Sequence, residues 1–157
     1  MNNSIYKLRR DELIKVIPKN SILLIPGADM QYRNADSAYA FRQDSSFYYF
    51  SGFSEPASLI AIVNNKEGIS SIVFVQPKDK LKEIWDGNRA GPIGAVDEFL
   101  FDKAYDNTQI DTMMPDILSG SSQVLCAIGK KSGFDQKVID WSTKASSKDR
   151  HSKSINI

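Results

Sequence analysis

Hydrophobic and polar positions along the chain follow two periods, one typical of helices and one typical of buried strands. Over residues 6–17, Leu8, Leu13 and Ile17 recur near one face, which predicts a helix that Pro18 ends. Residues 22–25 are continuously apolar and precede a Pro-Gly pair, which predicts a strand buried on both faces. The same patterns predict further strands at 58–65, 70–77, 103–106 and 123–129, and further helices at 79–87, 95–100, 108–120 and 133–147.

Two segments of the chain are less regular. Residues 28–43 have no clean period, which predicts a loop. Ser45 or Ser46 is predicted to cap a short helix through SFYYFSG that Gly52 ends, with a strand as the alternative because aromatic residues favour strands. The strands at 58–65 and 70–77 predict a hairpin with a loop of about five residues. Alternating strands and helices predict an α/β fold, and the hairpin predicts that its sheet is mixed.

Length and composition fit one globular domain, because the chain has 157 residues, of which 41% are hydrophobic and 25% are charged. A net charge of +1, from 20 basic and 19 acidic residues, offers no concentrated positive field for a phosphate backbone. The sequence has neither an apolar run near the ~18 residues of a membrane span nor an apolar secretory signal. These features predict a cytoplasmic protein that binds neither nucleic acid nor a membrane.

Candidate catalytic residues are few. The single histidine, His151, lies in a Ser- and Lys-rich tail, and the single cysteine, Cys126, lies in an apolar run that predicts a buried thiol. The glycines of GNRAGPIG match neither the dinucleotide-binding nor the P-loop pattern. Four acidic residues offer oxygen ligands for a hard cation, but their spacing favours solvated or capping roles: Asp29, Asp36, Asp44 and Glu55.

The stretch FRQDSSFYYFSGFSEP, residues 41–56, contains six aromatic residues. Aromatic side chains stack on nucleobases when basic residues alternate with them, and Arg42 is the only basic residue in this stretch. Spacing alone therefore favours a core element. Taken by themselves, the residues predict an α/β domain without a visible catalytic centre.

With the residues before it, this stretch reads RNADSAYAFRQDSSFYYFSGFSEP, from Arg33 to Pro56. It closely resembles the motif R-x-x-D-x-x-Y-x-[FY]-R-Q-[ND]-S-x-F-x-Y-[FL]-[ST]-G-[FY]-x-E-P of the N-terminal domain of Xaa-Pro aminopeptidase, also called aminopeptidase P. EIWDGNRAG, residues 83–91, resembles the E-x-W-x-G-x-R-x-G segment of the same family. The resemblance implies a mixed sheet flanked by helices, as in the creatinase N-terminal domain, with an RNase-H-like topology.

The resemblance also implies two domains with different functions. Residues 1–145 would form the N-terminal domain, and residues 146–157 would begin a linker to a C-terminal catalytic domain of pita-bread fold. That second domain would hold two metal ions, usually manganese, and release the first residue of peptides with proline at position two. Its metal-binding segments are not found in this sequence, so this chain alone is expected to hold no metal and to be inactive.

The resemblance implies partners and three residues at the rim of the active site. N-terminal domains of the family help to assemble a dimer or tetramer and partly cover the active sites. By its place in the motifs, Asp36 lies near the mouth of the active site, Trp85 reaches the active site of a neighbouring subunit, and Arg42 is expected at the same rim. Without the resemblance, Trp85 would be expected to pack on the core face of its own helix.

Two alternative functions stay open from the sequence. The chain could be a stand-alone interaction module, because creatinase-type N-terminal domains also occur in proteins that have lost catalysis. It could also be a hydrolase or nuclease that uses the four acidic residues, and this alternative ranks well below the others.

Overall fold

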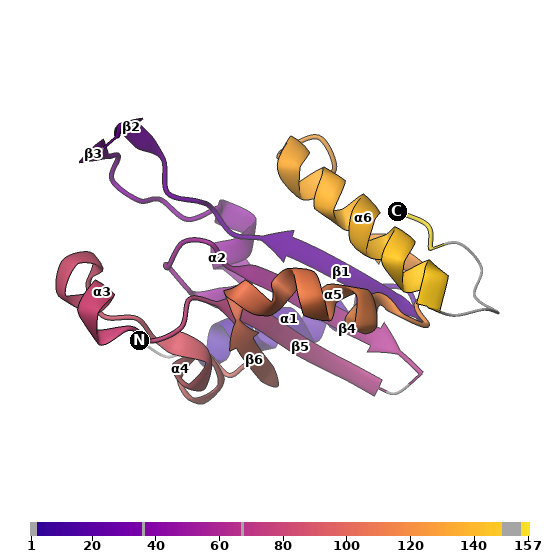
Figure 1. The fold of residues 1–157 in the computed structure, drawn as a ribbon. Coiled ribbons are helices and arrows are strands. Elements are labelled where there is room, and N and C mark those ends of the chain that lie inside the picture. Colours follow the sequence, from indigo (N-terminus) through magenta and orange to yellow (C-terminus); the bar gives the residue numbers. More distant parts are fainter. Residues whose placement is uncertain (1–2, 36, 67, 149–154) are drawn as a thin grey trace.

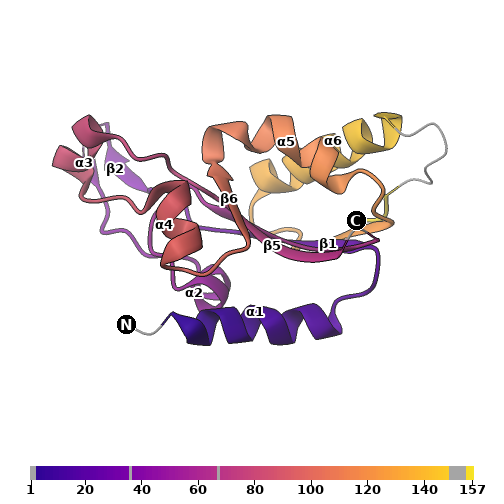
Figure 2. The same ribbon diagram turned by 90° about the horizontal axis from the view of Figure 1, so that it is seen from below.

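The computed structural model describes residues 3–35, 37–66, 68–148 and 155–157, which form a five-stranded sheet between two layers of helices (Figures 1 and 2). The strand order is β6-β5-β4-β1-β7. Both β1 and β5 pair antiparallel with β4, whereas β6 is parallel to β5 and β7 is parallel to β1. The predicted mixed sheet is confirmed. The strands are β1 (Ser21–Pro26), β4 (Leu59–Asn65), β5 (Gly68–Val75), β6 (Lys103–Asp106) and β7 (Gln123–Leu125).

Helices cover both faces of the sheet (Figure 2). One face packs against α1 (Ser4–Val16), α2 (Ser45–Ser51) and α4 (Gly91–Asp97). The other face packs against α5 (Ile110–Leu118) and α6 (Ser132–Lys148), and a short 3-10 turn, η1 (Asn107–Gln109), leads into α5. The predicted flanking of the sheet by helices is therefore also confirmed.

The continuous apolar runs of the sequence are the central strands of this sheet. In β1, Ile22 and Leu24 belong to the core under α5 and α6, whereas Leu23 and Ile25 belong to the core over α1 and α2. Successive side chains of a strand point to opposite faces, so a strand covered on both sides needs an apolar residue at every position. The prediction that residues 22–25 are buried on both faces is thus correct.

Several boundaries differ from the predictions. The segment 28–43 contains a small exposed hairpin, β2 (Tyr32–Asn34) with β3 (Ser37–Ala38), which has no apolar face to reveal it in the sequence. The pairing of β4 with β5 continues to Asn65 and Gly68, so their connection is shorter than the predicted five residues. Helix α4 begins at Gly91, with Pro92 in its first turn, rather than at residue 95.

The carboxyl ends of β7 and α6 also differ from the predictions. Strand β7 ends at Leu125 instead of residue 129, and α6 continues to Lys148, through residues 146–148 of the predicted linker. The domain boundary at residue 145 itself stays a prediction. His151 lies outside the described residues. Residues 155–157 return to the sheet edge, where Asn156 forms a parallel bridge with Gln123 of β7.

Two segments extend from the same end of the molecule, as both views show (Figures 1 and 2). They are the β2–β3 hairpin, which follows β1, and α3 (Lys80–Asp86), which follows β5. Because β1 and β5 are both antiparallel to β4, their carboxyl ends lie at the same edge of the sheet. This edge therefore carries the β2–β3 hairpin and α3, the helix that contains Trp85.

Candidate functional site

The first motif segment is organised around Gln43. The Gln43 Oε1 accepts hydrogen bonds from the backbone nitrogens of Ala28, at 2.6 Å, and Asp44, at 2.9 Å. Its Nε2 donates to the backbone oxygen of Glu55 at 2.8 Å. One amide side chain thereby connects the segment after β1, the start of α2 and the approach to β4. This motif glutamine holds the loops in register, which is a structural role.

The aromatic residues of the motif divide between the core and the surface. Phe47 and Phe53 are fully buried under the sheet, whereas Tyr48 and Tyr49 of α2 are exposed. Asp44, rather than Ser45 or Ser46, caps α2, because its carboxylate accepts from the backbone nitrogens of Ser46 and Phe47. The stretch is a helix, and the alternative of a strand is wrong.

Gly52 ends α2 in a left-handed conformation, with φ 67°. A Cβ at this position would lie 2.3 Å from the Tyr6 ring of α1, closer than any side chain tolerates. The glycine is therefore required twice, by its backbone angle and by the approach of α1.

The second motif segment forms α3 and the turn behind it. Asp79 caps α3 through the backbone nitrogens of Leu81 and Lys82, and the hydrogen bond from the Lys82 backbone lowers the pKa of Asp79. Glu83 accepts a hydrogen bond from the backbone nitrogen of Arg89 at 3.1 Å. Gly87 ends the helix with φ 87°. The motif thus encodes a short capped helix that turns back on itself.

Helix α3 presents apolar side chains to solvent. Trp85 is 88% exposed, and Leu81 and Ile84 are 76% and 73% exposed. The interpretation based on spacing alone, in which Trp85 packs on the core face of its helix, is therefore wrong. Three large apolar side chains on one projecting helix form a surface that is typical of a contact site. The role of Trp85 at an active site stays a prediction.

The other two predicted rim residues are less informative. Arg42 is exposed and lies in a shallow depression next to Arg9 and Tyr49, where the Arg9 guanidinium is 4.0 Å from the centre of the Tyr49 ring. Asp36 lies outside the described residues. Their place at a rim beside Trp85 is not tested.

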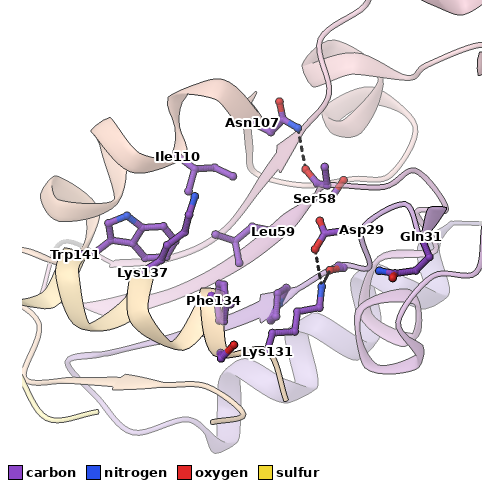
Figure 3. Close-up of a pocket in the computed structure, with 15 residues that line it drawn as sticks. Asp29, Gln31, Ser58, Leu59, Asn107, Ile110, Lys131, Phe134, Lys137 and Trp141 are labelled. Atoms are coloured by element: carbon purple, nitrogen blue, oxygen red, sulfur yellow. Dashed lines mark hydrogen bonds and ion pairs between the residues drawn. The ribbon is translucent and has the colours of Figure 1, made fainter. Parts of the chain in front are cut away.

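A cavity of about 610 Å³ lies between the start of α6, the carboxyl end of β1 and the start of β4 (Figure 3). Lys131 donates to the backbone oxygen of Gly27 at 2.6 Å and pairs with Asp29 at 3.2 Å. Asn107 donates to the backbone oxygen of Ala57 at 2.9 Å. Sequence reasoning missed this cavity because its walls come from four separate segments, none of which carries a motif.

Three of the four candidate acidic residues have separate partners, and Asp36 lies outside the described residues. Asp29 pairs with Lys131, Asp44 caps α2, and Glu55 Oε1 accepts from the backbone nitrogen of Ala90 at 2.7 Å. Burial raises the pKa of Glu55, and the hydrogen bond from Ala90 and the charge of Arg89 oppose that rise. These roles are structural, which removes the main support for a hydrolase or nuclease built on these acids.

No group of three His, Cys, Asp or Glu side chains that could hold a metal ion occurs among the described residues. Those residues therefore do not fit the two-metal centre that the family resemblance implies for the catalytic domain. Cys126 is a half-buried free thiol, and burial raises its pKa, as expected for an unreactive cysteine. Within the described ranges, no helix is long and apolar enough to cross a bilayer.

The fold and the two motif segments define an α/β domain whose mixed sheet carries a displayed helix at one edge. The family model described as "Aminopeptidase P, N-terminal domain" matches residues 6–126, and the chain belongs to this family.

Similar proteins are named as Xaa-Pro aminopeptidases. The Haemophilus influenzae Xaa-Pro aminopeptidase is 34% identical over 113 residues, which is 72% of this chain and 26% of the relative. The Escherichia coli Xaa-Pro aminopeptidase is 32% identical over 126 residues, which is 80% of this chain and 29% of the relative. The chain thus spans less than a third of the length of these relatives.

Solved structures show the same likeness. The structure of Pseudomonas aeruginosa aminopeptidase PepP superposes with a TM-score of 0.91 at 33% identity, covering 100% of this chain and 36% of that chain. Zn-substituted E. coli aminopeptidase P in complex with product superposes with a TM-score of 0.86 at 28% identity, covering 100% of this chain and 37% of that one.

Proposed function

We propose that this chain is the non-catalytic N-terminal domain of a metallopeptidase that releases the first residue from peptides with proline at position two. In this proposal the chain packs against its own C-terminal catalytic domain, contributes to a homodimer or homotetramer, and helps to cover the active sites. The observation that carries the proposal is the display of Trp85 on α3, within a chain that belongs to the aminopeptidase P N-terminal family.

The metal chemistry is assigned to the catalytic domain. Two divalent ions, which we expect to be manganese, would supply the hydroxide that attacks the peptide bond before proline. In this proposal, the residues described here contribute the walls and the cover of the site and no ligand to either ion. A cytoplasmic setting stays part of the same proposal.

The decisive experiment uses the full-length parent. Trp85→Ala is expected to lower kcat/KM for an X-Pro peptide by about tenfold or more, because an aromatic wall that excludes water would be lost. Ile139→Ala, which removes an exposed apolar side chain from α6, is the matched control and should leave kcat/KM unchanged. An unchanged kcat/KM for Trp85→Ala would refute the proposed covering role.

Two measurements on the isolated chain address the rest of the proposal. Titration with Mn²⁺ in a calorimeter should show no binding, and an X-Pro peptide should remain intact in the presence of the chain. Release of the first residue by the chain would contradict a non-catalytic role. A reading frame without metal-ligand residues beyond Ile157 would favour the stand-alone interaction module instead.

A further inference from the structure

Helix α3 is not held in place by buried apolar side chains. Among its residues whose side chains are described, Glu83 is half-buried and every other one is exposed. A helix of seven residues is far below the length at which helices are stable in isolation, about 12–15 residues. Its orientation therefore depends on the contacts at its base, where the chain leaves β5 and enters α4.

At the base of α3, the residues before the helix and the residues after it lie close together. Gly91 has φ 64°, and a Cβ there would lie 3.0 Å from the Cγ of Lys78 and 3.4 Å from its backbone nitrogen. The buried Arg89 reaches across the same base, with its Nη1 3.5 Å from the backbone oxygen of Pro77. The two ends of the segment between β5 and α4, residues 76–90, are thus held next to each other.

Two carboxylates bind the backbone of residues 89–90, which follow α3 and lead into α4. Glu83, on α3 itself, accepts from the backbone nitrogen of Arg89 at 3.1 Å. Glu55, which lies in the first motif segment, accepts from the backbone nitrogen of Ala90 at 2.7 Å. The second oxygen of Glu55 is buried and receives no hydrogen bond from the described residues. Burial of a carboxylate costs free energy, which the hydrogen bond from Ala90 and the charge of Arg89 offset in part.

We propose that Glu55 is a positioning residue that fixes the base of α3 and thereby orients Trp85. Glu55 belongs to the segment that Gln43 anchors to the sheet edge, so the bond to Ala90 connects the displayed helix to the rigid part of the domain. Glu83 assists from the helix side. The link to catalysis rests on the proposed function, whereas the mechanical role of Glu55 does not.

Hydrogen exchange on the isolated chain tests the mechanical role. Glu55→Leu should speed exchange of the Ala90 amide by about tenfold or more, because a charge-assisted hydrogen bond is lost, while amides of β4 and β5 stay protected. Glu55→Gln keeps an acceptor oxygen and should retain most of the protection. Glu12→Leu, at an exposed position of α1, is the control and should change nothing at Ala90.

Fluorescence measures the consequence for Trp85. In a Trp141→Phe background, Trp85 is the only tryptophan, and its residual anisotropy should fall with Glu55→Leu but not with Glu12→Leu. Glu83→Leu is a second variant outside the core and should speed exchange of the Arg89 amide. Unchanged exchange at Ala90 in Glu55→Leu, or equal loss of protection in β4 and β5, would overturn the proposal.

The parent enzyme separates this proposal from the proposed function. Glu55→Leu should lower kcat/KM for an X-Pro peptide, as Trp85→Ala does, and Glu55→Gln should restore it. If Trp85→Ala leaves kcat/KM unchanged, the covering role fails while the exchange result on the chain still stands. If the exchange result fails, the positioning role fails whatever the parent shows.

Discussion

The two tryptophans lie in regions that place the same side chain in opposite environments. Trp141 of α6 is 2% exposed, packs edge-on against Phe134, and donates its Nε1 to Asp111 at 3.0 Å. Trp85 of α3 is 88% exposed. Helix α6 lies on the sheet, and α3 extends away from it (Figure 1). Burial here follows the position of the helix in the fold rather than the hydrophobicity of the residue.

Arg10 is the opposite case, a charged residue that the fold buries. This charged residue is fully buried between α1, α2 and the end of α4. Its guanidinium donates to the backbone oxygens of Phe50, Phe99 and Leu100 and lies 3.9 Å from the centre of the Phe101 ring. Burial lowers its pKa to about 10, so it stays protonated at neutral pH. The packed layers bury a charge whose two terminal nitrogens are hydrogen-bonded to backbone oxygens, whereas α3 leaves apolar side chains exposed.

The largest expected effect is in the packed region. Trp141→Ala should lower the free energy of unfolding by about 3–5 kcal/mol, because it leaves a cavity between α6 and the sheet. Urea denaturation followed by circular dichroism measures it, with Trp141→Phe as the milder control. A loss below about 1 kcal/mol would contradict the packing described for Trp141.

Arg10→Leu should be nearly as damaging. We expect a loss of about 2–4 kcal/mol, because three backbone oxygens in the interior lose their donor. Lys7→Leu, an exposed position on the same helix, should change stability little. Equal effects of the two substitutions, in the same denaturation assay, would show that burial of Arg10 is not what stabilises α1.

The environment of Trp141 also predicts a pH dependence. Desolvation alone would raise the pKa of Asp111, but the hydrogen bonds from Lys137 and Trp141 outweigh it and lower the pKa below its usual value of 3.8. Because the folded state lowers the pKa of Asp111, the ionised carboxylate contributes stability to the fold above pH 3.8. This contribution is lost as the pH falls through the pKa of Asp111 in the folded state.

The test compares the wild type with Asp111→Asn between pH 7 and pH 3. The wild type should lose more stability than the variant over the acid end of this range. Parallel curves would mean that Asp111 titrates alike in the folded and unfolded states.

The smallest expected effect on stability is at Trp85. Trp85→Ala should change the free energy of unfolding by no more than about 0.5 kcal/mol, because the side chain contacts little of its own domain. Its removal should leave a blue-shifted emission spectrum from Trp141 alone. A destabilisation comparable to that of Trp141→Ala would erase the distinction between the two regions.

Sequence reasoning identified most elements that pack against the sheet, because packing imposes a period on apolar residues. Leu24 and Ile25 could be assigned to a strand buried on both faces from their run alone. The exposed β2–β3 hairpin was missed because no apolar face is needed there. Helix α3 was predicted, but spacing alone placed Trp85 inward, since an apolar side of a helix normally marks the core.

Tertiary contacts were the least predictable. Nothing local in the sequence indicates that Arg10 would meet backbone oxygens 40 to 90 positions away, or that Glu55 would bond to Ala90. The family motifs identified these segments as special without saying why. The structure gives a physical reason for several motif residues: Gln43 connects loops, Gly52 leaves room for the Tyr6 ring, and Glu55 accepts a hydrogen bond from Ala90 at the base of α3.

The reach of Arg10 has a consequence for synthesis. Arg10 leaves the ribosome with α1, but its acceptor at Leu100 is made 90 residues later. At about 5–20 residues per second, roughly 5–18 seconds pass before the last of the three acceptors exists. Until then the hydrogen bonds from Arg10 to Phe99 and Leu100 cannot form. Helix α1 therefore gains its full set of contacts only after the segment that follows α4 has been translated.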